Sequence, residues 1–193
     1  MNRLPITSTY RLQLRGPKAD EGGRAFTFAD AAEQVPYLAD LGISHLYLSP
    51  ILAAVPESNH GYDVIDPTTV NPEIGGMAGL QELAEAAHKA NMGIIIDLVP
   101  NHLGVEDPQL NEWWWDVLTN GRDSQFEPYF DIDWHEDNGA GGKMGLPVLG
   151  SPEDLDKLEI DRSGDEPLLR YYDNVYPVKP GTDEGTPQEI HDR

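Results

Sequence analysis

The sequence predicts an α/β fold built on a parallel sheet, and three observations support this. Three short runs, at residues 8–14, 43–48 and 94–98, have the composition of strands. Two longer stretches between them, residues 28–39 and 77–91, place apolar side chains at helical spacing. Strands that alternate with helices in this way favour a parallel sheet with right-handed crossovers.

The first strand and helix carry local signals for where they begin and end. Residues 9–14 alternate between apolar and polar side chains, as a half-buried strand does, and a Gly-rich polar loop is expected at residues 15–25. Thr27 and Asp30 have the spacing of a capping pair at a helix start. Pro36 is expected to kink or divide this helix, because it has no backbone donor.

The third strand leads into the most informative stretch of the chain. Residues 94–96 are three consecutive isoleucines, the pattern of a strand buried on both faces. Asp97, Asn101 and His102 follow at its carboxyl end, where α/β sheets and (β/α)₈ barrels place their chemistry. A buried strand with an ordinary polar turn is the plain alternative. The complete D-x-x-x-N-H string favours a functional site.

A second polar cluster lies in the long segment 49–76, which has little periodicity. Loops of this length in compact domains tend to be functional. Tyr62 offers a flat apolar face with a polar rim, which suits stacking on a pyranose ring. Asp63 can accept hydrogen bonds from vicinal hydroxyls, and Gly61 lets a backbone approach closely. A turn glycine beside a half-buried tyrosine is the alternative reading of this cluster.

Charge and cysteine content restrict the partners. The net charge is −21, and residues 104–193 hold 22 acidic against 7 basic side chains. Such a surface repels nucleic acid and anionic lipid, so we expect neither as a partner, whereas neutral sugars remain possible. Solubility or salt adaptation also accounts for the acidic excess. The absence of cysteine excludes disulfides and thiolate metal sites and fits a cytoplasmic protein.

The helix–strand rhythm stops after His102, so we expect two parts, residues 1–102 and 103–193. The second is expected to be an irregular inserted subdomain. Its predicted elements are a short aromatic helix, a strand and a linker or ragged end, at residues 111–118, 130–134 and 179–193. The tryptophans at 113–115 suit either a core or a glucan-stacking surface. His135 and its acidic neighbours suit either an acidic loop or a cation site.

These residues resemble the α-amylase superfamily of glycoside hydrolases and transglycosidases, family 13. Residues 97–102 match its first signature region and residues 61–63 match its strand-two loop. The resemblance implies a partial (β/α)₈ barrel, comprising its first three strands and two helices. It makes Tyr62 the platform under the sugar, and Asp63 and His102 hydrogen-bond partners of that sugar. Asp97 and Asn101 would support neighbouring active-site groups.

A closer resemblance is to one subfamily, the (1→4)-α-D-glucan 1-α-D-glucosylmutases. The matching segments cover much of the chain and lie at residues 8–14, 47–51, 58–63, 113–118, 130–134 and 146–150. This resemblance implies an isomerase of trehalose biosynthesis, which converts the reducing-end α-1,4 bond of maltooligosaccharides to an α,α-1,1 bond. A hydrolytic α-amylase or α-glucosidase, or a non-catalytic glucan-binding piece, is the alternative.

The chain departs from the family at the reacting groups. The family needs an Asp nucleophile and a Glu acid/base, in motifs of the G-x-R-x-D kind, and no such motif occurs here. A complete (β/α)₈ barrel takes about 250 residues. We therefore expect an amino-terminal part of a longer enzyme, with no catalytic residue of its own and no activity alone. No oxygen cluster has calcium-loop spacing, so no metal and no cofactor are inferred.

Overall fold

The computed structural model describes residues 4–15, 25–179 and 181–191, so most of the predicted loop at 15–25 and the last two residues lie outside the described part. The chain separates into two compact units, Met1–Gly104 and Val105–Arg193. No described helix is long and apolar enough to cross a membrane.

The first unit contains the predicted parallel sheet. Its strands are β1 (Thr9–Leu12), β2 (His45–Leu48) and β5 (Gly93–Ile96), hydrogen-bonded in the order β1-β2-β5. Both pairings are parallel. This confirms that the three predicted strands are parallel neighbours, although each is shorter than expected.

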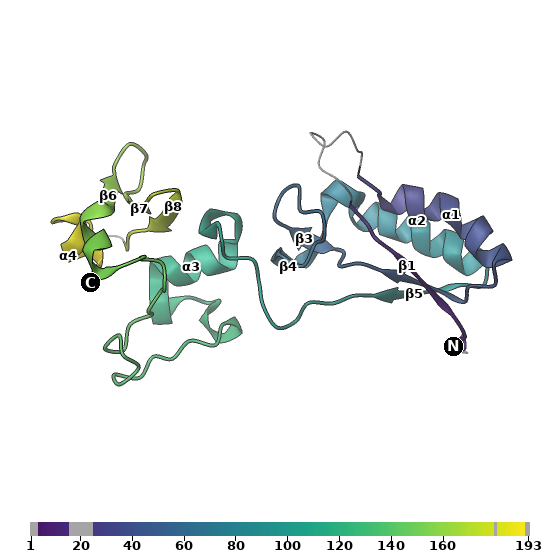
Figure 1. The fold of residues 1–193 in the computed structure, drawn as a ribbon, viewed down its shortest axis with the longest axis horizontal. Helices are drawn as coiled ribbons and strands as arrows, with labels where there is room; N and C mark the ends of the chain where they lie inside the picture. The colour runs from purple at the N-terminus through teal and green to yellow at the C-terminus, as the bar shows by residue number, and fades with distance from the viewer. Residues whose placement is uncertain (1–3, 16–24, 180, 192–193) are drawn as a thin grey trace. The chain divides into compact units, whose positions relative to one another are not determined.

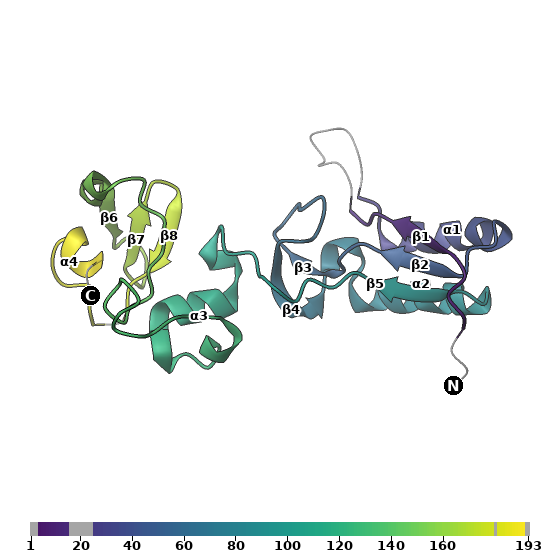
Figure 2. The same cartoon turned by 60° about the horizontal axis from the view of Figure 1, so that its bottom comes forward.

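Two helices lie along this sheet, α1 (Phe28–Asp40) and α2 (Gly76–Lys89) (Figures 1 and 2). The predicted capping box is present at the start of α1, where the backbone N–H of Thr27 donates to Asp30 at 2.8 Å. Pro36 does not divide α1, since the helix continues through this exposed residue to Asp40.

The core of the first unit lies between the helices and one face of the sheet. It combines alternate strand residues with the inner faces of α1 and α2, among them Leu12, Leu46, Leu48, Phe28, Leu38 and Leu83. Ile94 packs against this core, whereas Ile96 is 37% exposed. Within the described residues, the prediction of a strand buried on both faces is therefore wrong. Helices cover only one side of β5 here.

The segment 49–76 is more regular than its sequence suggested. It holds an antiparallel pair, β3 (Leu52–Ala54) and β4 (Val64–Val70), followed by the single turn η2 (Pro72–Ile74). The register of this pair shifts twice along its length. A three-residue strand with an irregular register leaves no period-2 pattern, which explains why the sequence did not reveal it.

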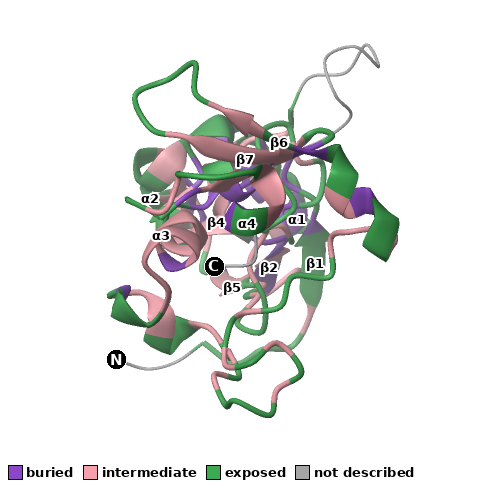
Figure 3. Ribbon diagram, turned by 90° about the vertical axis from the view of Figure 1, so that its left-hand side faces the viewer, coloured by how far each residue is buried: buried purple, intermediate pink, exposed green. Residues whose placement is uncertain are grey.

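The second unit consists of short elements. They are α3 (Glu112–Asn120), the single-turn or short 3-10 helices η3 (Pro108–Leu110), η4 (Gly121–Asp123), η5 (Glu127–Tyr129) and η6 (Pro152–Lys157), the strands β6 (Leu158–Asp161), β7 (Leu168–Tyr171) and β8 (Asn174–Pro177), and α4 (Pro187–His191). The strands form an antiparallel sheet in the order β6-β7-β8, and β7 has intermediate burial along most of its length (Figure 3). The predicted aromatic helix is confirmed as α3.

Two predictions for the second unit are wrong. Residues 130–134 form no strand, because no other described segment pairs with them. The Trp134 indole instead donates to Glu127 at 2.7 Å. The predicted linker at 179–193 contains the helix α4 within its described part. Ile190 is buried there, and Gln188 donates to the Leu155 carbonyl at 2.9 Å, so tertiary contacts hold this acidic segment.

Candidate functional site

Asp97 is the centre of a hydrogen-bond cluster at the carboxyl end of the parallel sheet. Its Oδ2 accepts from the Tyr62 hydroxyl at 2.7 Å, the Tyr47 hydroxyl at 3.2 Å and the Arg11 Nη1 at 3.3 Å. Arg11 Nη2 also donates to the Tyr62 hydroxyl at 3.1 Å. We call Asp97, Tyr62, Tyr47 and Arg11 the Asp97 cluster.

The strand register brings these side chains together. Arg11 pairs with Tyr47, and Tyr47 pairs with Ile95, so the three residues form a row across β1, β2 and β5. Side chains alternate between faces along a strand, so Asp97, two residues after Ile95, continues on the same side. The backbone N–H of Asp97 donates to the Leu48 carbonyl at 3.1 Å, which keeps the pairing regular up to this residue.

The cluster stabilises charge on both of its ionic members. The hydrogen bond from Tyr62 is the largest cause that lowers the pKa of Asp97, and Arg11 and Tyr47 lower it further against the opposing effect of burial. The hydrogen bond to Tyr62 and the contact with Asp97 raise the pKa of Arg11. Asp97 is therefore ionised at neutral pH, with one oxygen surrounded by three donors. Such a carboxylate is suited to orienting its neighbours.

The loop at residues 61–63 presents Tyr62 at this edge of the sheet. The Tyr62 backbone N–H donates to the His60 ring at 3.0 Å, and its carbonyl oxygen lies 3.0 Å from His102 Nε2. Tyr62 is 37% exposed. Its hydroxyl and backbone are thus fixed by four neighbours while part of the ring stays accessible, as a stacking platform requires.

Asp63 lies beside the cluster but has different partners. Its Oδ1 accepts from the Ser58 hydroxyl at 2.6 Å and lies 3.7 Å from His60 Nδ1. Ser58 also accepts from the Gly61 backbone N–H at 3.0 Å, so one hydroxyl ties the carboxylate to the loop that carries it. The Asp63 side chain remains 30% exposed.

The structure thus brings three of the five predicted site residues together: Tyr62, Asp97 and His102. Asp63 is adjacent to Tyr62 in the loop. Asn101 is exposed, and no described residue hydrogen-bonds its side chain. The roles of these five residues toward a sugar stay predictions.

Sequence reasoning missed Arg11 and Tyr47 as members of the site. Both lie inside strands, and their importance depends on the pairing of β1 with β2, which no local pattern reveals. Arg11 Cζ lies 4.9 Å from the centre of the Tyr47 ring, so the two side chains also support each other directly. The one feature of the sequence that could have indicated Arg11 as a site residue is its place on the polar face of the predicted first strand.

The contacts of the other candidate residues indicate structural roles. Trp113 stacks on Phe126 with ring centres 5.1 Å apart, and Trp114 lies 5.1 Å from Phe130, which favours the core interpretation of the aromatic helix. His45, a residue of β2 outside these candidates, is buried and hydrogen-bonded to Ser44. Within the described ranges, no group of three or more His, Asp or Glu side chains is placed to hold a metal ion.

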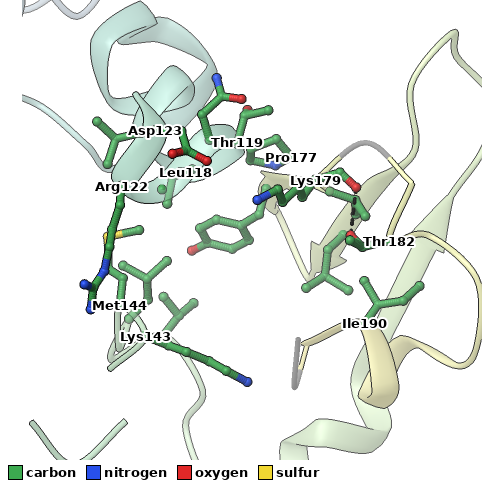
Figure 4. A pocket seen from close by; sticks show the side chains of 18 of the residues that line it. Leu118, Thr119, Arg122, Asp123, Lys143, Met144, Pro177, Lys179, Thr182 and Ile190 are labelled. Atoms are coloured by element: carbon green, nitrogen blue, oxygen red, sulfur yellow. Dashed lines mark hydrogen bonds between the residues drawn. The ribbon is translucent and has the colours of Figure 1, made fainter. Parts of the chain in front are cut away.

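The second unit has a pocket of its own, of about 630 Å³ (Figure 4). Apolar side chains make up most of its wall, including Leu118, Met144 and Ile190, and Lys143 and Lys179 also line it. Burial raises the pKa of Tyr176, another lining residue. None of the five predicted site residues contributes to this pocket.

Comparison with known proteins identifies the class. Residues 27–152 match the family model described as alpha amylase, catalytic domain. This match spans more than half of the sequence, and the chain belongs to the α-amylase family.

The relatives point to a narrower group. The chain is 53% identical over 190 residues to a protein assigned as a maltooligosyl trehalose synthase in Mycobacterium tuberculosis, covering 98% of this chain and 24% of the relative. The solved maltooligosyltrehalose synthase of Arthrobacter ramosus is 48% identical, with a TM-score of 0.81, covering 98% of this chain and 23% of that one. The intracellular maltogenic amylase of Bacillus subtilis is 37% identical over 100 residues, 52% of this chain and 16% of the relative. The chain therefore spans about a quarter of the length of these synthases.

Proposed function

We propose that this chain forms the first part of the (β/α)₈ barrel of a (1→4)-α-D-glucan 1-α-D-glucosylmutase. The enzyme would belong to the isomerases and convert the reducing-end α-1,4 bond of a maltooligosaccharide to an α,α-1,1 bond. One observation carries this most directly. The Asp97 cluster lies at the carboxyl end of three parallel strands, in a chain whose similarity to maltooligosyltrehalose synthases extends through both units.

In the proposed mechanism, the described residues bind and orient the reacting glucosyl unit. The exposed part of the Tyr62 ring stacks under the sugar, and Asp63 and His102 hydrogen-bond its hydroxyls. Asp97 holds the Tyr62 hydroxyl and Arg11, so it fixes the platform rather than attacking the sugar. Asn101, which is exposed, supports a neighbouring group of the complete active site.

The chemistry itself requires two further carboxyl groups. A retaining enzyme uses one as nucleophile and one as acid/base, about 5 Å apart, and forms a glycosyl-enzyme intermediate. The released glucose must stay bound and attack again through its anomeric hydroxyl. Water must be excluded from the site meanwhile, since it would hydrolyse the intermediate. We propose that the nucleophile and the acid/base lie in the part of the complete enzyme that corresponds to the three quarters of the relatives' length not spanned by this chain.

The substrate in this proposal is a neutral α-1,4-glucan, and no nucleic acid, membrane, metal or cofactor takes part. A strongly anionic surface suits a neutral ligand, because no charge attraction is needed to recruit it. The cytoplasmic location expected from the cysteine-free sequence belongs to the same proposal. So does the interpretation of residues 103–193 as a subdomain inserted after the third barrel strand.

Product analysis tests the proposal. The complete enzyme is incubated with maltopentaose, and the products are separated by chromatography. We expect a non-reducing product of unchanged length, with its end group identified by NMR as an α,α-1,1 bond. Maltose and glucose as the main products would show a hydrolytic amylase or α-glucosidase instead. Binding of maltopentaose without turnover would indicate a glucan-binding protein.

A further inference from the structure

Arg15 is a buried cation beneath the loop that carries Tyr62. It follows β1, and its backbone exchanges two hydrogen bonds with Phe26, at 2.8 and 3.0 Å. Only 3% of the residue is exposed. Burial of a guanidinium is costly unless its donors are satisfied, so its contacts indicate what it is there to hold.

The guanidinium binds the segment that follows β2. Nη1 donates to the Pro50 carbonyl, and Nη2 donates to the Leu52 carbonyl at 3.0 Å. These two acceptors lie two residues apart, where the chain leaves β2 and enters β3. The planar fork of an arginine matches two neighbouring acceptors, and the single ammonium of a lysine does not.

The same end of the guanidinium also lies against Gly61. A Cβ added at Gly61 would lie 2.3 Å from Arg15 Nη1 and 2.4 Å from Cζ. Gly61 also has φ = +76°, so both its backbone conformation and the neighbouring arginine require a glycine here. The glycine that precedes Tyr62 and Asp63 is thus in contact with the buried cation.

Nearby carboxylates favour the charged guanidinium of Arg15 at this buried position. Burial lowers the pKa of Arg15, and the carboxylates of Asp63 and Glu73 act in the opposite direction. Asp63 is one of the predicted sugar-binding groups and lies two residues after Gly61. No described residue accepts a hydrogen bond from Arg15 Nε, so the fork toward Pro50 and Leu52 carries the polar contacts seen here.

We propose that Arg15 is a positioning residue, which holds the 61–63 loop against the carboxyl end of β2 and so sets the Tyr62 platform and Asp63 for the sugar. This inference rests on the proposed function. A purely stabilising role would lower the melting temperature alone. A positioning role also changes how the folded enzyme treats its substrate, because a small displacement of a sugar-holding group is costly in rate.

The test compares Arg15→Lys and Arg15→Met in the complete enzyme, with Arg170→Met as the matched control. Arg170 is an arginine of the second unit paired with Asp161. For each protein, kcat, KM and the fraction of cleaved maltopentaose released as free glucose are measured well below its melting temperature. We expect both Arg15 variants to lose at least about tenfold in kcat/KM. The glucose fraction should rise, since a loosened sugar site lets glucose escape. Arg170→Met should leave both unchanged.

The outcomes separate the two proposals. If the wild-type enzyme forms no α,α-1,1 product, the proposed function fails irrespective of Arg15. If the wild type forms that product and a folded Arg15→Lys variant keeps its kcat/KM and glucose fraction, the positioning role is overturned. The lysine variant retains the buried charge, so it decides the question even where Arg15→Met does not fold.

Discussion

The two units of this protein are stabilised in different ways. In Met1–Gly104, two long helices and a parallel sheet share one continuous apolar core. In Val105–Arg193, the elements are short, and side chains often satisfy nearby backbone groups. Asp107 accepts from the Gln109 N–H at 3.1 Å, Asn111 from that of Trp114 at 3.1 Å, and Asp161 from that of Ser163 at 2.9 Å. A periodic core is visible in a sequence, whereas a fold built from such turns is not.

Each unit also holds a carboxylate that accepts a hydrogen bond from a tyrosine hydroxyl. The two carboxylates differ in their exposure and in the elements they connect. Asp97 accepts from Tyr62 at an exposed edge, with partners from β1, β2 and the 61–63 loop. Asp154 accepts from the buried Tyr171 and pairs with Lys157 at 2.7 Å. The first arrangement leaves an accessible ring beside a fixed charge. The second links η6 to β7 within the second unit.

The largest expected effect concerns the 193-residue chain assayed by itself, apart from the rest of the complete enzyme. We predict that the 193-residue chain does not turn over maltopentaose. Its first unit carries the predicted sugar-holding groups, but no G-x-R-x-D motif occurs in either unit. Double displacement cannot proceed without a nucleophile and an acid/base. Chromatography of a long incubation checks this. Turnover that persists through purification and disappears in Asp97→Asn would contradict both this prediction and the positioning role of Asp97.

The two carboxylates provide the next comparison. In the complete enzyme, Asp97→Asn is expected to lower kcat by about a hundredfold, because Tyr62 and Arg11 lose the charge that orients them. Asp154→Asn is expected to lower the melting temperature and leave kcat unchanged, because Lys157 loses its partner. Steady-state kinetics and thermal unfolding of both variants measure the contrast. Equal losses of kcat would contradict the division of roles.

Matched leucine substitutions compare the two cores. Leu46 is completely buried in the first unit, and Leu158 is 5% exposed in the second. Leu46→Ala should lower the free energy of unfolding by about 3 to 5 kcal/mol and Leu158→Ala by about 2 kcal/mol, since the smaller core relaxes more easily. All four tryptophans lie in the second unit, so their fluorescence reports its unfolding, whereas circular dichroism reports both. A larger loss of unfolding free energy for Leu158→Ala than for Leu46→Ala would contradict the prediction that the core of the second unit relaxes more easily.

The smallest expected effect concerns pH. Hydrogen bonds from Ser163, followed by Arg170, lower the pKa of Asp161 from 3.8 to about 2. A lowered folded-state pKa stabilises the fold above pH 3.8, and this contribution is lost as the pH falls toward about 2. Carboxyl NMR titration should show this midpoint, and Ser163→Ala and Arg170→Gln should each raise it. For Asp97, the hydrogen bond from the Tyr62 hydroxyl is the largest cause, so Tyr62→Phe should raise its pKa. A midpoint that stays unchanged in any of these variants would contradict the assigned cause.

Local sequence determined much of the first unit. The Thr27–Asp30 capping pair, the helical spacing in α2 and the isoleucine run before Asp97 each depend on neighbours a few residues apart, so they could be recognised without coordinates. The same holds for the two motifs that carry the resemblance to the α-amylase family. Strand–helix alternation then sufficed to predict a parallel sheet.

Tertiary structure alone decided which distant groups meet. Arg11 and Arg15 look alike in sequence, yet one binds Asp97, 86 residues away, and the other lies buried against Gly61. The β3–β4 pair and the helix α4 likewise depend on partners outside the local pattern, since Leu52 pairs with Val70 and Gln188 donates to the Leu155 carbonyl. Short-range patterns fix which face of an element is apolar. The register between strands and the burial of single charges depend on free energies summed over the whole fold, and these no local pattern contains.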